Sequence, residues 1–245
     1  MELIPAIDIR DQKCVRLRQG DPGEQTIFDE SPLKVAREFV EAGAIKIHIV
    51  DLDGAIDNAS HNVSVIRQIV DELPVKVELG GGIRSFKTIQ SWLDAGIDQV
   101  ILGTVAVENP TVVKKAVESF GADRIIVGID TKGGNAATHG WQSISDRSAI
   151  EFAQKLTEVD VSRFIYTAIE TDGMMSGPSL EELSEFAESV PAKVTASGGV
   201  RNLDDILALR EYESLGIDSV IVGRAIYEGK VNVAETVQAL AGEKN

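Results

Sequence analysis

Eight short apolar runs alternate with segments of helical periodicity along the chain, and this alternation restricts the fold more than any other feature. Each run is rich in Val and Ile and is apolar throughout, as expected for parallel strands covered on both faces. Such strands alternating with helices are typical of α/β proteins. The runs are Leu3–Ile9, Ile45–Leu52, Val75–Leu79, Gln99–Leu102, Ile125–Ile129, Phe164–Ile169, Ala192–Ala196 and Ser219–Val222.

The second half of the chain repeats motifs of the first half. Four such matches predict two (β/α)4 halves. The expected fold class is therefore α/β, a single (β/α)8 TIM barrel built from two (β/α)4 half-barrel repeats, and 245 residues are the usual length for one such domain over 1–245. The matches are Asp8 with Asp130, Gly81-Gly82-Ile83-Arg84 with Gly198-Gly199-Val200-Arg201, Leu102-Gly103-Thr104 with Val222-Gly223-Arg224, and Asp51 with Thr167.

Glycine pairs follow the third and seventh runs, and single glycines follow the fourth and eighth. Glycine lets the backbone approach an anion closely, and free backbone N–H groups can then bind it. In barrels of this class the phosphate site is frequently built after strands 7 and 8. The repeat predicts a second phosphate site half a barrel away, with Asp8 and Asp130 across the barrel from one another. The predicted substrate carries a phosphate at each end and meets two carboxylates near its middle.

Composition excludes several classes of function. A net charge of −15 repels nucleic acid and anionic membranes, so we expect neither as a partner. No stretch approaches the roughly 18 apolar residues of a membrane span, and the N-terminus lacks the features of a signal peptide, so we expect a cytoplasmic protein. Three scattered histidines and the single Cys14 show no metal-binding spacing, and we expect no metal. We interpret Cys14 as a small apolar residue, and His48, inside an apolar run, as a hydrogen-bonded core residue.

Two connections are long for links between a strand and the following helix. They span residues 10–30 after the first run and residues 131–146 after the fifth. Both follow strands, so they lie on the face where barrel active sites are built. We expect both to be lids over the site.

The motifs of nearly the whole chain resemble, in order, those of the histidine-biosynthesis isomerases, the phosphoribosylformimino-5-aminoimidazole carboxamide ribotide isomerase family. The resemblance implies a cofactor-free Amadori rearrangement of an aminoaldose to an aminoketose, on a small substrate with two phosphates. The motifs are Pro5-Ala6-Ile7-Asp8, Val15-Arg16-Leu17, Gln19-Gly20-Asp21, His48-Ile49-Val50-Asp51-Leu52-Asp53-Gly54-Ala55, Gly80-Gly81-Gly82-Ile83-Arg84, Gly140-Trp141, Asp172-Gly173, Ser176-Gly177-Pro178, Ala196-Ser197-Gly198-Gly199-Val200 and Val222-Gly223-Arg224-Ala225.

The resemblance also implies roles for individual residues. Asp8 resembles the proton acceptor of the family, and either Asp130 or Asp172 resembles the proton donor; the two alternatives remain open. Thr167 resembles a residue that supports the reaction by hydrogen bonding, and Trp141 one that covers the substrate. The residues expected to bind substrate or phosphate are Arg16, Gly20, Asp51, Gly82, Arg84, Gly103, Thr104, Trp141, Gly177, Ser197, Gly198, Gly199, Gly223 and Arg224.

We expect the chain to be a monomer. Three alternatives remain beside the isomerase interpretation. The chain could also isomerise phosphoribosyl anthranilate, since Val77-Glu78-Leu79 resembles the dual-function actinobacterial relatives. It could be the cyclase subunit of imidazole glycerol phosphate synthase, although Arg16-Leu17-Arg18-Gln19 resembles the isomerases instead. It could also be a barrel that binds a bisphosphate without catalysis.

Overall fold

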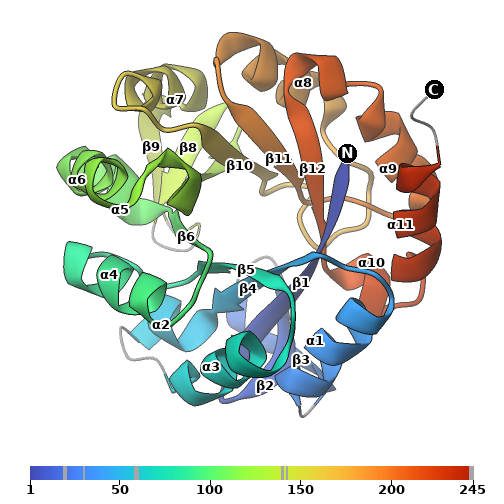
Figure 1. The fold of residues 1–245 in the computed structure, drawn as a ribbon. Helices are drawn as coiled ribbons and strands as arrows, with labels where there is room; N and C mark the ends of the chain where they lie inside the picture. The colour runs from blue at the N-terminus through green and yellow to red at the C-terminus, as the bar shows by residue number, and fades with distance from the viewer. Residues whose placement is uncertain (19–20, 30, 58–60, 139–140, 142, 243–245) are drawn as a thin grey trace.

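The computed structural model describes residues 1–18, 21–29, 31–57, 61–138, 141 and 143–242. In this part of the chain eight parallel strands form a closed barrel, and β1 pairs with both β4 and β12 to close it (Figure 1). All eight strands predicted from the apolar runs are confirmed. Around the barrel they are β1 (Glu2–Arg10), β4 (Lys46–Asp51), β5 (Lys76–Gly80), β6 (Gln99–Leu102), β7 (Ile125–Lys132), β10 (Arg163–Ala168), β11 (Lys193–Ser197) and β12 (Ile217–Val222).

Helices form a ring outside the strands (Figure 1). Their ends follow local capping signals: the Ser31 side chain accepts a hydrogen bond from the Lys34 N–H, and Pro32 occupies the first turn, where its missing N–H costs nothing. The longer helices are α1 (Pro32–Glu41), α3 (Val63–Glu72), α4 (Phe86–Asp94), α6 (Pro110–Phe120), α7 (Ala149–Thr157), α8 (Leu180–Ser189), α9 (Leu203–Arg210) and α11 (Val233–Ala241). Short helices are α2 (Leu52–Asp57), α5 (Thr104–Glu108), α10 (Arg224–Tyr227), and the 3-10 turns Ala122–Arg124 and Glu213–Leu215.

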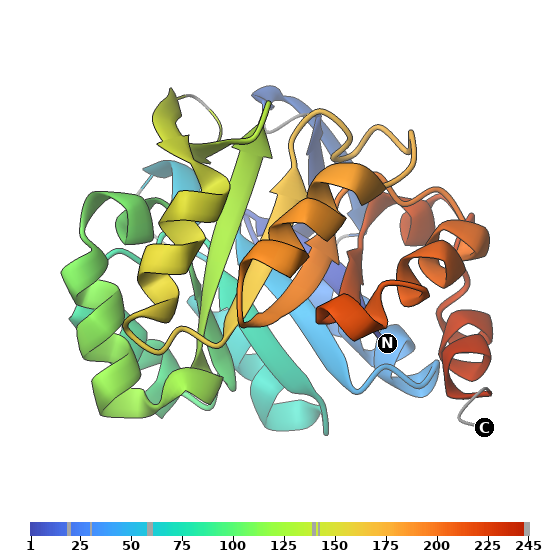
Figure 2. The same ribbon diagram turned by 90° about the horizontal axis from the view of Figure 1, so that it is seen from above.

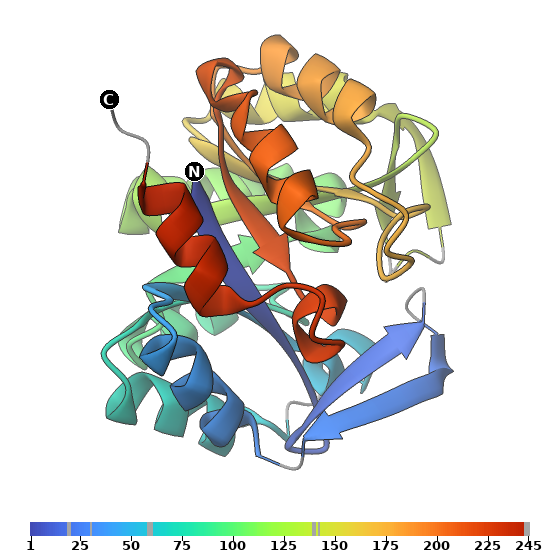
Figure 3. The ribbon, with the colours of Figure 1, turned by 90° about the vertical axis from the view of Figure 1, so that its right-hand side faces the viewer.

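The two long connections are β-hairpins rather than irregular loops. β2 (Lys13–Arg18) and β3 (Asp21–Asp29) follow β1, and β8 (Asn135–Thr138) and β9 (Ser143–Ser148) follow β7. β1 and β7 extend past the barrel and pair with the hairpins, with Asp8 opposite Val15 and Asp130 opposite Ala137. Figures 2 and 3 place both hairpins at the same end of the barrel. This is the carboxyl end of the strands, where the sequence predicted the site.

The two ends of the barrel interior differ in chemistry. In the middle, Ile4, Ala6, Ile126, Ile165 and Ile221 pack into one apolar cluster. At the amino end, where β4, β6, β10 and β12 begin, the interior is polar: the Lys46 ammonium donates to Gln99 Oε1 over 3.0 Å, and the Arg163 guanidinium meets Asp218. The apolar layer therefore separates a polar floor from the cavity at the other end.

The Arg163–Asp218 pair in the floor leads to a prediction about stability. The guanidinium donates to both Asp218 carboxylate oxygens, over 2.7 and 2.8 Å. Burial raises the pKa of Asp218, but the hydrogen bonds and charge of Arg163 outweigh it and hold the pKa below its ordinary value. We expect Asp218→Asn to lower the free energy of unfolding by about 2 kcal/mol at pH 7, because a charge-assisted bond is lost from a partly buried arginine.

A carboxyl whose pKa is lowered in the folded state stabilises the fold above its unfolded pKa, and that contribution disappears as the pH falls through the folded value. The difference between wild type and Asp218→Asn should therefore shrink below about pH 4, the ordinary pKa of aspartate. Urea unfolding at pH 7 and at pH 3 measures both quantities. An equal difference at the two pH values would contradict this account.

Candidate active site

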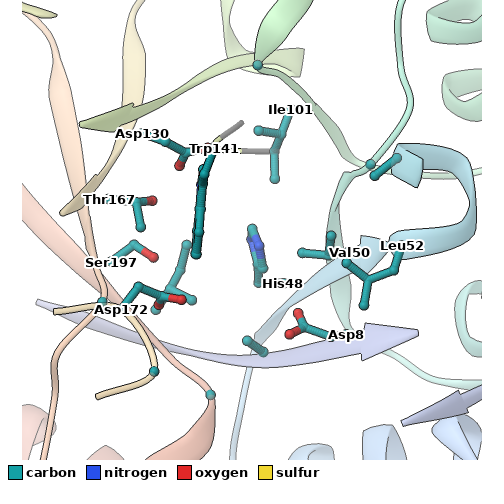
Figure 4. A pocket seen from close by; sticks show the side chains of 18 of the residues that line it. Asp8, His48, Val50, Leu52, Ile101, Asp130, Trp141, Thr167, Asp172 and Ser197 are labelled. Carbon is teal, nitrogen blue, oxygen red and sulfur yellow. The ribbon is translucent and has the colours of Figure 1, made fainter. Parts of the chain in front are cut away.

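A cavity of about 600 Å³ lies at the carboxyl end of the barrel, beneath the level of the two hairpins. All eight barrel strands, or the residues that directly follow them, contribute to its wall (Figure 4). Fourteen of the predicted site residues line it together, although they come from positions spread over the whole chain. These are Asp8, Gly82, Arg84, Gly103, Thr104, Asp130, Trp141, Thr167, Asp172, Ser197, Gly198, Gly199, Gly223 and Arg224.

Four predicted residues do not appear in this wall, for two reasons. Gly20 and the side chain of Arg16 lie outside the described residues. Asp51 and Gly177 are described but do not line the cavity. The Asp51 carboxylate is 2% exposed and accepts hydrogen bonds from Asn62 Nδ2 over 2.7 Å and from the Gly54 N–H. The Gly177 N–H donates to the Gly199 carbonyl over 2.9 Å, so its role here is to hold that glycine loop.

The strand register explains why Asp51 was misplaced. Asp8 lies opposite Val50 in β4, and Asp130 lies opposite Thr167 in β10. The partner of Thr167 in the first half is therefore Val50, and the predicted match with Asp51 is wrong by one residue. Because successive side chains of a strand point to opposite faces, a shift of one residue turns Asp51 away from the cavity.

Several positions of the cavity wall accept only glycine, and Gly82 and Gly199 illustrate why. Gly82 has φ +67°, and a Cβ there would lie 2.1 Å from the Gly54 carbonyl oxygen. Gly199 has φ +83°, and a Cβ there would lie 2.3 Å from the Gly177 carbonyl oxygen. Side chains are excluded at both by close approach and by left-handed backbone. We call Gly81–Arg84 with Gly103 and Thr104 the first cradle, and Gly198–Val200 with Gly223 and Arg224 the second cradle.

The two cradles face one another across the barrel. In the closed order of strands, β5 and β6 stand four places from β11 and β12, which is half the circumference of eight strands. The backbone at Gly103 (φ −98°, ψ −104°) is also close to that at Gly223 (φ −107°, ψ −94°). A ligand that spans the cavity can therefore reach two glycine loops of similar shape.

Three aspartates face the space between the cradles (Figure 4). Asp8 on β1 and Asp130 on β7 lie on opposite sides, and Asp172 follows β10. Burial raises the pKa of Asp130, while hydrogen bonds from the side chains of Trp141 and Thr167 oppose that rise. A carboxyl whose charged form is disfavoured retains a proton to a higher pH and is suited to donate it.

Comparison with known proteins agrees with this geometry. The model of the family described as "Histidine biosynthesis protein" matches residues 2–232. The chain belongs to this family. Relatives from Microcystis aeruginosa and Thioalkalivibrio sulfidiphilus are 48% and 47% identical, and the alignments cover 98% and 99% of this chain and 94% and 100% of theirs. A third, from Halothermothrix orenii, is 43% identical over 94% of this chain and 96% of its own. Each is named 1-(5-phosphoribosyl)-5-((5-phosphoribosylamino)methylideneamino)imidazole-4-carboxamide isomerase.

Two arginines hold the loops that carry site residues. Arg84 donates to the Gly54 and Ala55 carbonyls over 3.2 and 2.7 Å, and thereby joins the first cradle to the loop after β4. Arg224 donates to the Gly173 carbonyl over 2.6 Å, and thereby joins the second cradle to the loop that carries Asp172. Both arginines are among the residues that line the cavity.

His48 lines the cavity, a place that the sequence did not predict for it. Its hydrogen bond is confirmed: Nδ1 lies 2.8 Å from Glu78 Oε1. The imidazole nevertheless stands in the middle of the cavity rather than in the core (Figure 4). A signal was present, because His48 is two residues before Val50 and therefore shares its inward face, and it lies opposite Ala6, two residues before Asp8.

No cluster of three His, Cys, Asp or Glu side chains with the arrangement of a metal site occurs in the described part of the chain. Among the same residues, no helix has the length and apolar character needed to cross a membrane.

The raised pKa of Asp130 leads to a prediction with opposite signs for activity and stability. The folded state disfavours the ionised form of the Asp130 carboxyl. Above the raised pKa, the charge of this carboxylate therefore lowers the free energy of unfolding. We expect Asp130→Asn to raise the melting temperature at pH 8 and to lower turnover about 100-fold, since an amide cannot act as the acid. The gain in melting temperature should vanish near pH 3, below the ordinary aspartate pKa of about 4, because the wild-type carboxyl is then largely neutral in both states. Calorimetry at the two pH values tests this, and a lower melting temperature at pH 8 would overturn it.

Proposed function

We propose that this chain catalyses the isomerisation for which its relatives are named, the Amadori rearrangement of N′-((5′-phosphoribosyl)formimino)-5-aminoimidazole-4-carboxamide ribotide to its phosphoribulosyl isomer in histidine biosynthesis. The observation that carries the proposal is the pair of cradles on opposite sides of one cavity, with Asp8 and Asp130 between them. The substrate of such an isomerase has a phosphate at each end, and its reacting sugar lies between them. The cradles supply backbone N–H groups that suit phosphate oxygens.

The chemistry requires one acid and one base. The acid gives a proton to the ring oxygen, the bond between C1′ and that oxygen breaks, and an imine forms at C1′. Asp8 then removes the proton from C2′ to give an enaminol. C1′ takes up a proton and the C2′ hydroxyl gives up its own, which leaves the ketose. C1′ is reduced and C2′ oxidised within one molecule, so no external redox partner is needed.

We propose Asp130 as the acid, because burial favours its protonated form. Asp172 remains the alternative, since it lines the same cavity. Trp141, whose indole crosses the cavity in Figure 4, is proposed to stack on the imidazole base of the substrate. We propose the β2–β3 and β8–β9 hairpins as lids, since they stand at the mouth of the cavity.

Steady-state turnover of the aminoaldose bisphosphate by wild type, Asp130→Asn and Asp172→Asn tests the proposal. Wild type should convert it, and the variant that lacks the acid should lose about 100-fold or more in kcat. Phosphoribosyl anthranilate is assayed in parallel, and its conversion would add a second substrate. Turnover of the ketose product in the presence of ammonia, without isomerisation, would indicate the cyclase. If the chain catalyses none of these reactions, only the alternative of a barrel that binds a bisphosphate without catalysis would remain.

A further inference from the structure

A carboxylate lies buried directly beneath the cavity and has only one hydrogen-bond partner within the described residues. Glu78 on β5 is 0% exposed. Its Oε1 lies 2.8 Å from His48 Nδ1, whereas its Oε2 has no hydrogen-bond partner in the described part of the chain. A buried charged group is costly unless it is paired. The contact with His48 is therefore the interaction that specifies where this carboxylate stands.

The alternative role for Glu78 is to neutralise the polar floor. Lys46 Nζ is 3.8 Å from Glu78 Oε2, which is too long for a hydrogen bond, and donates instead to Gln99 Oε1 over 3.0 Å. Glu2 also approaches Lys46, at 3.9 Å. The lysine therefore has other partners, and its attraction to Glu78 is electrostatic and without a directed bond. Glu78 directs its one hydrogen bond toward the cavity rather than toward the floor.

The hydrogen bond from Nδ1 fixes which part of His48 faces the cavity. With Nδ1 bound to a carboxylate, the other ring nitrogen, Nε2, is left for a ligand. Figure 4 shows the imidazole in the middle of the cavity, with Asp8 on one side and Trp141 on the other. A ligand held at both cradles must pass over this ring. The carbon from which Asp8 takes the proton must lie within reach of Asp8, which stands beside this ring in Figure 4.

We propose that His48 binds the sugar hydroxyl on C2′, the carbon from which Asp8 takes the proton, and that Glu78 is a positioning residue that holds the ring for this contact. The inference rests on the proposed function. A hydroxyl both donates and accepts, so it bonds Nε2 in either protonation state. A polar group fixed under the reacting carbon orients the sugar for the reaction, and it adds no proton-transfer step.

The charges around His48 make a pH readout informative. Asp8 faces it from β1, Glu78 from β5, Asp130 from β7 and Asp172 from the segment after β10, while Lys46 lies on its own strand. The charge of His48 lowers the pKa of Asp130, against the effect of burial. Removal of the ring takes this effect away, so the pH dependence set by Asp130 should move to higher pH.

The first test needs no substrate. The chain has three histidines, so ¹⁵N-detected spectra of the imidazole rings are simple, and His48→Gln identifies the signals of His48. We expect a proton on Nδ1 in wild type and in Glu78→Gln, whose amide oxygen still accepts. Glu78→Leu should change the signals of both ring nitrogens. Unchanged signals in Glu78→Leu would overturn the role of Glu78.

The second test is kinetic. We expect His48→Leu to lower kcat/KM about 100-fold and His48→Gln, whose amide nitrogen stands near the position of Nε2, to remain within about tenfold of wild type. Glu78→Leu should lose as much as His48→Leu, and the double variant should lose no more than either, because Glu78 acts through the ring. Losses that multiply in the double variant, or a His48→Gln variant as impaired as His48→Leu, would overturn the proposal.

Asp218→Asn is the matched control, because it weakens the polar floor without touching the cavity. It should lower the free energy of unfolding and leave kcat/KM unchanged. A loss of kcat/KM in the Glu78 variants would then not be explained by lower stability. A wild-type chain without turnover would overturn the proposed function and with it the contact of His48 with the substrate. The spectra would still decide the geometry of Glu78 and His48, so the two failures can be told apart.

Discussion

Replacement of Asp8 by asparagine is expected to lower kcat by about 10³- to 10⁴-fold, the upper part of the range for loss of a general base. Asparagine keeps the size of the side chain and cannot accept the C2′ proton. The backbone at Asp8 is fixed on both sides, opposite Val50 in β4 and Val15 in β2, so the substitution should leave the fold unchanged. KM should change little, since the substitution leaves both proposed phosphate cradles intact. The loss is measured by the amount of product formed at fixed times, and by the uptake of solvent deuterium at C2′ of the substrate.

Asp11→Asn is the control for this prediction. Asp11 lies three residues after Asp8, is exposed, and has φ +48°, which asparagine adopts readily. Its side chain does not line the cavity. Turnover by Asp11→Asn should equal that of wild type. If Asp8→Asn exchanged the C2′ proton as fast as wild type, another group would have to be the base.

Replacement of Gly199 by alanine is expected to raise KM about 100-fold, which corresponds to the loss of two hydrogen bonds to a charged group at about 1.5 kcal/mol each. The new Cβ would stand 2.3 Å from the Gly177 carbonyl oxygen, so the second cradle must move. kcat should fall less than KM rises, because Asp8 and Asp130 lie on other segments, although the loop that carries Asp172 adjoins Gly199. Inhibition by inorganic phosphate is a second measure, and it should weaken in the variant.

The variant Gly121→Ala distinguishes the effect of a steric clash from the effect of the backbone conformation. Gly121 has φ +90°, similar to Gly199, but a Cβ there would meet nothing within 4 Å. This variant should lose about 1 kcal/mol of stability from the left-handed backbone and keep its KM. A KM for Gly199→Ala equal to that of Gly121→Ala would mean that the second cradle does not bind phosphate.

The sequence predicted the strands well because each is buried on both faces, and burial is visible as an unbroken apolar run. It did not predict the hairpins, since their strands form through pairing with one another and with the extensions of β1 and β7, and these contacts lie outside each strand's own segment. The glycine loops were predictable from motif and repeat. Asp51 was misplaced because a repeat in the sequence does not reveal the register of the strands, and the His48–Glu78 contact between neighbouring strands was missed for the same reason.

The pairing of β1 and β7 with both the barrel and a hairpin has a consequence for how such a chain can change its substrate. The carboxylates at Asp8 and Asp130 are set by the sheet, because each is paired with a barrel strand and with the first strand of a hairpin. The outer parts of the hairpins can therefore vary in length and sequence while the reacting groups keep their places. Selection for a new ligand can act on these outer parts without first disrupting catalysis, and exchange of hairpins between related barrels is a practical way to redesign specificity.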